Sequence, residues 1–309
     1  MNKKSIFSGA WCPSVTPFTT NGKLDFRALE KHLCRITDAG TDVILIMGSI
    51  GEFTSLNQSE KLQLIHEARN MTDIPLVVNV SSTCIDDLKQ LADRAYTVGY
   101  DAVMFLPHYY FGQTYNQMFE YYLQIGSAIE GKWLAYNFPA RTGCSLDAKL
   151  VAALAAEMPN FVGIKDTVDT LSHTRAIIRE VKAIRPDFQV LSGFDEYCIP
   201  NLLSGGSGVI SGLNNIVPQL FVQAIDALND GHLEKVAEIQ QLIGKYSSIY
   251  TIGEDFVTTI KTVVSRKFGY MTPASRSNGA ALSRQACMET DALFGTQYEF
   301  NNAIIPTVV

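Results

Sequence analysis

The sequence lacks several features that would indicate particular classes of protein. Its six cysteines, at positions 12, 34, 84, 144, 198 and 287, form no Cys-x-x-Cys pair and no Cys/His cluster. We therefore expect reduced thiols in a cytoplasmic protein, without disulfides or a metal centre. The formal net charge is -6 and there is no run of lysine and arginine, which argues against nucleic acid as a partner.

Long apolar runs are missing as well. None approaches the roughly 18 residues that a membrane helix needs, so we expect no membrane partner. At the N-terminus, Gly9, Pro13 and Pro17 interrupt the chain before the apolar core of a signal peptide could form. There is also no Walker phosphate-binding loop, and no Gly/Ser-rich linker divides the chain.

What the sequence contains is a regular alternation of β-rich runs and helical patterns. The β-rich runs lack strict polar alternation, which is typical of parallel strands covered on both faces. They span residues 9–18, 43–49, 75–81, 102–107, 133–138, 161–166, 189–194 and 208–212, and the first is interrupted by prolines. The helical patterns between them span residues 25–39, 58–71, 85–98, 115–129, 146–157, 170–184 and 195–204.

This alternation predicts an α/β protein with a (β/α)₈ TIM barrel over residues 1–216. Leu88, Leu91, Ala92 and Ala95 show the apolar spacing of a helix that packs on such a barrel, and Asp25 and Ser59 lie where helices commonly begin. Residues 217–295 read as helices without intervening strands, and we expect the C-terminal part, residues 217–309, to complete the barrel and to take part in packing or assembly.

In a TIM barrel, the functional side chains project from the carboxyl ends of the strands. The segments at those positions are GSIGE (48–52), PHYY (107–110), YNFPARTG (136–143), KDT (165–167), GFDE (193–196) and SGLNN (211–215). Lys165 is the most unusual of these residues because it ends an apolar strand, and lysine is rarely buried without a partner.

A buried lysine has an accessible neutral amine, because burial disfavours the charged form. Such an amine attacks a ketone and forms a Schiff base, which takes up electrons when a neighbouring C–C bond breaks. The alternative is that Lys165 extends to solvent or pairs with Asp166. Tyr136, one strand earlier, is a candidate for proton transfer, although a tyrosine at a strand end is more often a core residue. Ser49 and the amides of its glycine-bracketed turn are candidates for binding a carboxylate.

Taken together and in this order, GSIGE, PHYY, YNFPARTG, GIKDT, GFDE and GVIS resemble the N-acetylneuraminate lyase/dihydrodipicolinate synthase family of Schiff-base aldolases. The resemblance runs from about residue 9 through the C-terminal helices. It implies a TIM barrel, a pyruvate or other 2-keto acid substrate, no cofactor and no metal, and a homotetramer built as a dimer of dimers.

The resemblance also implies roles for individual residues. Lys165 matches the Schiff-base lysine and Tyr136 the proton-relay tyrosine, while Ser49 and the Ile50 amide match the pair that binds the pyruvate carboxylate. Tyr109 matches a catalytic tyrosine contributed across the dimer interface, with Tyr110 as the alternative. Two further matches, Gly193 and Ile210, line the pyruvate pocket in the family.

Departures from the family pattern bear on the substrate. Ile50 replaces a threonine, which removes a hydroxyl that the synthase reaction uses. Thr167, Asp195 and Glu196 resemble the lyases, in which these positions bind sugar hydroxyls. Gly212 stands near a position where sialic acid lyases carry serine, and YNFP with GIKDTVDT is most similar to the 2-keto-3-deoxygluconate aldolase branch.

One residue favours the other branch. Arg141 matches the arginine with which the synthases hold their aldehyde substrate's carboxylate, a role that suits a guanidinium. The alternative is a loop arginine with a structural role.

The sequence therefore predicts a metal-independent, class I lyase that reversibly cleaves a 2-keto-3-deoxy sugar acid to pyruvate and an aldehyde. Dihydrodipicolinate synthase or a related Schiff-base dehydratase is the second hypothesis. A binding barrel without catalysis is the third, and the presence of both Lys165 and Tyr136 disfavours it. A metal-dependent aldolase is disfavoured because no ligand cluster surrounds His108 or His173.

Overall fold

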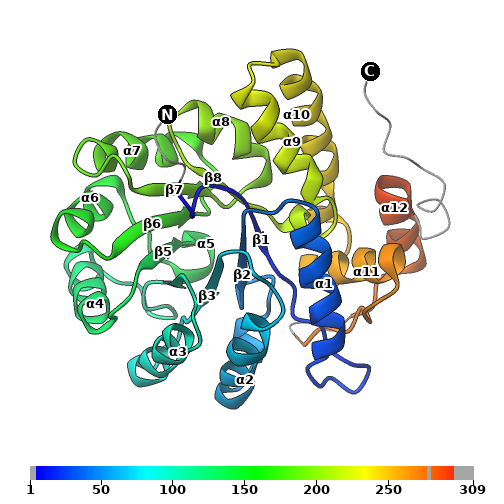
Figure 1. The fold of residues 1–309 in the computed structure, drawn as a ribbon, viewed down its shortest axis with the longest axis horizontal. Coiled ribbons are helices and arrows are strands. Elements are labelled where there is room, and N and C mark those ends of the chain that lie inside the picture. The colour runs from blue at the N-terminus through cyan, green and yellow to red at the C-terminus, as the bar shows by residue number, and fades with distance from the viewer. Residues whose placement is uncertain (1–4, 277–279, 296–309) are drawn as a thin grey trace.

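The computed structural model describes residues 5–276 and 280–295. Its centre is a closed barrel of eight parallel strands in sequence order, which confirms the predicted TIM barrel (Figure 1). The strands are β1 (Gly9–Pro13), β2 (Val43–Ile46), β3 (Leu76–Asn79), β4 (Ala102–Phe105), β5 (Trp133–Asn137), β6 (Phe161–Asp166), β7 (Gln189–Ser192) and β8 (Gly208–Ile210).

Helices surround the barrel, and the last four, α9 to α12, lie together on one side of it (Figure 1). The helices are α1 (Phe26–Asp38), α2 (Gln58–Arg69), α3 (Ile85–Thr97), α4 (Tyr115–Ala128), α5 (Pro139–Thr142), α6 (Ala148–Glu157), α7 (Leu171–Lys182), α8 (Cys198–Leu203), α9 (Pro218–Asn229), α10 (Leu233–Ser247), α11 (Phe256–Phe268) and α12 (Arg284–Phe294). Short 3₁₀ turns are η1 (Phe53–Ser55), η2 (Asp195–Tyr197), η3 (Gly212–Asn215) and η4 (Ser248–Thr251).

The helix starts follow capping chemistry. Asp25 caps α1 as expected, because its carboxylate accepts the Ala28 amide at 3.0 Å. Ser59 lies at the start of α2, as expected, but it is not the N-cap. Asn57 caps α2 instead and accepts the Glu60 amide at 2.9 Å, and the Glu60 carboxylate bonds back to the Asn57 amide to complete a capping box. Ser59 lies inside the first turn and donates to the Asn57 side chain.

Some strands are shorter than the apolar runs that predicted them. The run at 9–18 forms a strand only as far as Pro13, and the run at 43–49 ends as a strand at Ile46 because Met47 adopts a left-handed backbone with φ of 57°. The helical pattern at 195–204 divides into η2 and α8. These differences lie at the ends of elements, where loops over the barrel mouth override local propensity.

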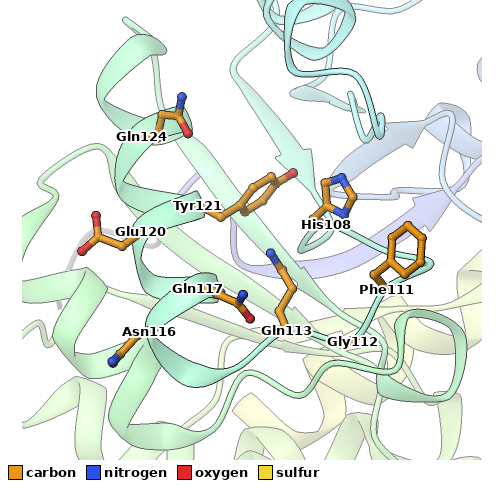
Figure 2. Close-up of a pocket in the computed structure, with 9 residues that line it drawn as sticks. All are labelled: His108, Phe111, Gly112, Gln113, Asn116, Gln117, Glu120, Tyr121 and Gln124. Carbon is orange, nitrogen blue, oxygen red and sulfur yellow. The ribbon is translucent and has the colours of Figure 1, made fainter.

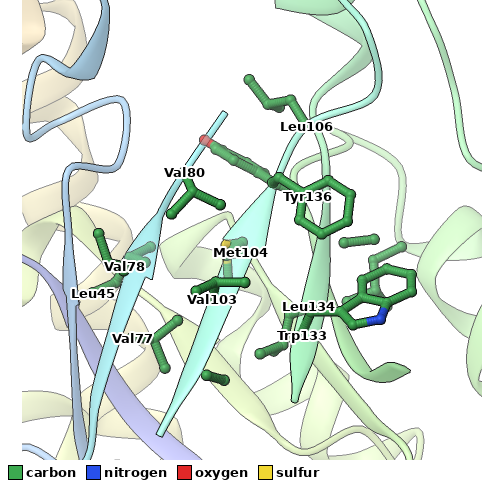
Figure 3. Packing of buried hydrophobic residues seen from close by; sticks show 14 of the residues in the cluster. Leu45, Val77, Val78, Val80, Val103, Met104, Leu106, Trp133, Leu134 and Tyr136 are labelled. Atoms are coloured by element: carbon green, nitrogen blue, oxygen red, sulfur yellow. The ribbon is translucent and has the colours of Figure 1, made fainter. Parts of the chain in front are cut away.

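Two apolar clusters hold the fold together. In the larger one, side chains of β2 to β5 pack closely (Figure 3), and Trp133 stacks on Phe161 with ring centroids 4.2 Å apart. The smaller cluster joins β1, β8 and α8 to helices α9, α10 and α11. The C-terminal helices therefore share a core with the barrel. Among the described residues, no helix combines the length and the hydropathy needed to cross a membrane.

Candidate active site

Lys165 and Tyr136 lie side by side at the carboxyl ends of β6 and β5. They are paired residues in the strand register, and both are almost fully buried, with exposed fractions of 5% and 1%. The Lys165 Nζ lies 4.4 Å from the centre of the Tyr136 ring. The Tyr136 hydroxyl is 3.1 Å from the Ser49 Oγ. Three residues from β5, β6 and the turn after β2 thus form one contiguous group.

The alternative partner of Lys165 is engaged elsewhere. The Asp166 carboxylate accepts hydrogen bonds from Asn137 at 2.7 Å and Thr174 at 2.6 Å, and it lies 3.1 Å from the His173 ring. The hydrogen bond that the His173 ring makes to the Asp166 carboxylate raises the pKa of His173, against the lowering effect of burial. Successive strand residues point to opposite faces, so Asp166 faces the surrounding helices while Lys165 faces the barrel.

Ser49 lies in a tight turn over residues 47–52. Both ends of the turn have left-handed backbone, with φ of 57° at Met47 and 56° at Glu52. Gly51 packs so closely that a Cβ there would lie 3.0 Å from the Met47 Cα. The turn presents Ser49 toward Tyr136 and places Ile50, 9% exposed, at the barrel mouth.

A cavity of about 260 Å³ opens above this group. Three predicted site residues line it, namely Ser49, Tyr109 and Arg141, and the last is exposed. Its remaining lining residues are Phe53, Thr54, Leu106, Phe138, Thr142, Asp255, Phe256 and Val257. Lys165 itself lies deeper, and Ser49 and Tyr136 connect it to the cavity.

Sequence reasoning missed the residues that the C-terminal helices contribute. Asp255, Phe256 and Val257 begin α11, and all three line the cavity. Asp255 caps the helix through the Thr258 amide at 2.8 Å. The N-cap pattern was visible in the sequence, but no local pattern says that this helix starts over the barrel mouth.

Thr167 and Gly193 are adjacent, as a shared role in substrate binding requires. A Cβ on Gly193 would lie 2.0 Å from the Thr167 Oγ1, so only glycine permits this approach. The Thr167 hydroxyl is buried and has no hydrogen-bond partner in the protein. Buried polar groups are normally paired, so this unpaired hydroxyl is an exception at the end of β6.

Asp195 is buried and contacts a residue of the C-terminal extension. It is 2% exposed, and its Oδ2 accepts a hydrogen bond of 2.5 Å from the Tyr250 hydroxyl. Burial raises the pKa of Asp195 to about 6, while the hydroxyls of Ser211 and Tyr250 act in the opposite direction. The Ser211 hydroxyl is near enough to lower this pKa, but neither it nor the Asp195 Oδ1 makes a hydrogen bond of normal geometry within the protein. Tyr250 was also missed in the sequence, because η4 brings it back from a distant segment.

The remaining predicted residues lie nearby. Ile210 is buried on β8 and pairs with Trp11 of β1, and the carbonyl of the partly exposed Glu196 accepts a bond from Gln240. At Gly212, a Cβ would lie 2.4 Å from the Tyr250 hydroxyl. Tyr250 therefore fills the space that a side chain at position 212 would take.

The two tyrosines after β4 differ in environment. Tyr109 is partly buried, lines the cavity of its own chain and packs edge-on against Phe53, with ring centroids 6.3 Å apart. Tyr110 is 85% exposed and has a left-handed backbone with φ of 89°. Which of them acts across an interface stays a prediction.

A larger hollow, of about 530 Å³, lies over α4 and the loop before it (Figure 2). Its lining includes His108, Gln113 and Tyr121 but none of the predicted site residues. It is an open surface hollow, whereas the smaller cavity is lined by Ser49, which contacts Tyr136 and through it Lys165.

No group of three or more His, Cys, Asp or Glu side chains is placed to hold a metal ion within residues 5–276 and 280–295. His32, which the sequence places in a helix, is fully buried and bonds to Tyr270 and Asn215. Independence from metal stays a prediction that needs its own experiment.

Residues 6–287 match the model of the dihydrodipicolinate synthetase family. The chain belongs to this family. Its members are class I aldolases and lyases that react with pyruvate through a Schiff-base lysine, and the protein is an enzyme of this class.

Individual relatives span both activities that the sequence suggested. The chain is 32% identical to the probable 2-dehydro-3-deoxy-D-pentonate aldolase YjhH of Escherichia coli K12, over 82% of this chain and 85% of that protein. It is also 32% identical, over 78% of this chain and 82% of the other, to a 4-hydroxy-tetrahydrodipicolinate synthase of Alkaliphilus oremlandii.

A third relative has a solved structure. YagE of E. coli K12, named a putative 2-dehydro-3-deoxy-D-gluconate aldolase, is 32% identical over 85% of this chain and 88% of that protein. Its crystal structure in complex with pyruvate superposes with a TM-score of 0.90 at 29% identity, covering 94% of this chain and 98% of the other.

Proposed function

We propose that this enzyme reversibly cleaves a 2-keto-3-deoxy sugar acid to pyruvate and an aldehyde, through a Schiff base on Lys165. The observation that carries the proposal is the contact of Lys165 with Tyr136, whose hydroxyl in turn meets Ser49. A buried amine beside a phenol matches the needs of carbon–carbon cleavage at a ketone.

The cleavage proceeds through the Lys165 amine. Nζ attacks the C2 ketone, the C2 oxygen leaves as water with the proton of the Tyr136 phenol, and the protonated imine draws electrons from the C3–C4 bond as it breaks. The C4 hydroxyl loses its proton to the Tyr136 oxygen, and the aldehyde departs. Protonation of the enamine at C3 gives the pyruvate imine, and water then releases pyruvate and frees Lys165.

The carboxylate of the keto acid binds at the turn over residues 47–52. The Ser49 hydroxyl and the Ile50 amide are the donors that we assign to it, with Gly193 and Ile210 enclosing the methyl end of pyruvate. Ser49 then serves both the carboxylate and the Tyr136 hydroxyl, which it approaches at 3.1 Å. Hydrogen bonds to a charged group are stronger than those between neutral groups.

The preference for a polyhydroxylated substrate rests on unsatisfied polar groups. Thr167 offers a buried hydroxyl without a partner, and Asp195 retains an unpaired Oδ1. A site built to pair hydroxyls discriminates by up to about 10⁴–10⁵ against analogues that lack them. Glu196, in the same turn, is the third candidate. The relatives YjhH and YagE are named as aldolases of 2-dehydro-3-deoxy sugar acids, which adds support to the proposal.

The second candidate is the condensation of pyruvate with aspartate semialdehyde. The specific observation in its favour is Arg141, which lines the cavity and can hold a second carboxylate. Against it stands Ile50, which carries no hydroxyl for the synthase relay. Arg141 can equally hold the distal carboxylate of a sugar diacid.

The deciding experiment compares kcat/KM for cleavage of 2-keto-3-deoxygluconate with kcat/KM for condensation of pyruvate with aspartate semialdehyde. We expect cleavage to be faster, and a screen of pyruvate release across 2-keto-3-deoxy acids then identifies the preferred sugar acid. Arg141→Ala is compared with Arg175→Ala, an exposed arginine on α7. If condensation is faster and Arg141→Ala abolishes it selectively, the synthase assignment replaces the lyase.

We also propose that the enzyme works in the cytoplasm as a homotetramer, a dimer of dimers, without nucleic-acid or membrane partners. The reduced-thiol pattern and the family resemblance support this. Light scattering of the purified protein measures the mass directly, and a species of about one 34.1 kDa chain would contradict it.

A further inference from the structure

The carboxylate-binding turn is anchored by a buried charge pair that comes from the other end of the chain. Glu52 ends the turn, is 1% exposed, and forms an ion pair with Lys261 of α11. Both side chains are completely buried. The two residues are 209 positions apart in sequence, so the contact exists only because α11 packs over the barrel.

Glu52 accepts further hydrogen bonds from the segment after α11. The Arg276 amide donates to its Oε2 at 2.6 Å, and the Ser275 hydroxyl donates to the same oxygen at 2.9 Å. Lys261 in turn donates to the Ala274 carbonyl at 2.9 Å. Three donors therefore hold the Glu52 carboxylate among the described residues, and all three belong to the C-terminal extension.

The turn needs such an anchor because its backbone is unfavourable at both ends. Met47 and Glu52 have left-handed φ values of 57° and 56°, and non-glycine residues persist in that region only where the surroundings enforce it. Asn79 holds the Met47 carbonyl at 2.9 Å, and Thr16 holds the Gly51 carbonyl at 2.7 Å. Of these three anchoring residues, Glu52 is the one that contacts the C-terminal extension, through Lys261 of α11.

A backbone hydrogen bond connects Glu52 to Ser49, one of the residues that we assign to carboxylate binding. The Glu52 amide donates to the Ser49 carbonyl at 3.1 Å, so a shift of Glu52 moves the Ser49–Ile50 peptide directly. The same helix, α11, also lines the cavity through Phe256.

We propose that Lys261 is a positioning residue for the keto-acid carboxylate, acting through Glu52 on the Ser49–Ile50 turn. This rests on the proposed role of that turn. Binding of pyruvate at the barrel mouth then depends on the C-terminal extension, although Lys261 touches neither the substrate nor Lys165.

The test uses the full-length enzyme and measures the pyruvate concentration that half-saturates borohydride trapping on Lys165. The variants are Lys261→Met, Glu52→Gln and the double variant, which removes both charges and leaves none unpaired. Replacing a whole buried pair by neutral groups often preserves folding, so the double variant keeps the test valid if Lys261→Met fails to fold. The matched control is Arg266→Met. Arg266 lies on α11, as Lys261 does, and forms an ion pair of 2.5 Å with Asp291 of α12. Its replacement breaks an ion pair of the same helix but leaves the Glu52 anchor intact.

We expect the folded variants to need about 10- to 100-fold more pyruvate, the loss associated with one or two weakened hydrogen bonds to a charged group. At saturating pyruvate, the yield of trapped Lys165 should equal that of the wild type, because the amine itself is unchanged. Arg266→Met should behave as wild type.

Two other results contradict the inference in different ways. If the folded double variant half-saturates at the wild-type concentration, the pair is purely structural and only this inference is overturned. If the wild type traps no pyruvate on Lys165 at any concentration, the proposed function is overturned and this inference with it.

Discussion

The Lys165 Nζ lies 4.4 Å from the centre of the Tyr136 ring, and the two residues are register partners on β6 and β5. Because the strands are parallel neighbours, this spacing is set by the barrel itself and not by a loop. An imine on Lys165 would therefore form beside the Tyr136 ring.

Lys165 should form the covalent intermediate. Incubation with pyruvate and borohydride should add one reduced pyruvyl group to the peptide that contains Lys165, because reduction traps the imine. Mass spectrometry of the digested protein measures this. Lys165→Met should lose the label and Lys149→Met, an exposed lysine on α6, should keep it. A label confined to a different lysine would refute the mechanism.

Tyr136→Phe should lower kcat by about 10²–10⁴-fold, the usual contribution of a positioned proton-transfer group. The ring and its packing remain, so the melting temperature should change little. Tyr122→Phe is the control, since Tyr122 is equally buried and its hydroxyl meets the Phe105 carbonyl at 3.4 Å. Steady-state cleavage rates decide the matter, and equal rates for both variants would remove Tyr136 from the mechanism.

Tyr109 should act in the site of a neighbouring subunit. Mixed oligomers test this: Lys165→Met and Tyr109→Phe subunits are each impaired, but in a mixture a Tyr109→Phe subunit with intact Lys165 receives an intact tyrosine from its partner. Activity should rise on mixing. The same experiment with Tyr110→Phe covers the exposed alternative. Recovery with Tyr110→Phe alone would move the assignment by one residue.

Activity should survive thorough chelation, because the imine and not a cation takes up the electrons during cleavage. The measurement is the cleavage rate after dialysis against a strong chelator, alongside total metal in the sample. Loss of activity that a specific divalent ion restores would show that the class I assignment is incomplete.

Stability should fall in acid because of His32. Burial, with help from Arg35, lowers its pKa from 6.5 to about 3. As the pH drops below about 6.5 the unfolded chain takes up a proton that the folded chain refuses, so the free energy of unfolding decreases until about pH 3. The penalty at the acid limit is on the order of 4–5 kcal/mol.

Urea unfolding at pH 7 and pH 4 measures this effect. His32→Gln should show a smaller decrease between the two pH values than the wild type, whereas His66→Gln, an exposed histidine on α2, should match the wild type. An identical pH dependence in all three proteins would assign the acid lability to other groups.

The eight-stranded barrel and three residues of the candidate site could be predicted from the sequence. Parallel strands buried on both faces must be apolar along their length, so the eight runs could be recognised without tertiary information. Catalytic residues follow strands in a TIM barrel, so the strand ends already pointed to Lys165, Tyr136 and Ser49. The structure brings those three into contact.

The contacts that the C-terminal helices make with the barrel mouth could not be predicted from the sequence. Lys261 reaches Glu52 across 209 residues, and Tyr250 reaches Asp195 across 55. Sequence patterns record the period of a helix and the residues that cap it, but not which distant surface it covers. Pairs of buried polar groups depend on that docking, because burying either group without its partner costs free energy.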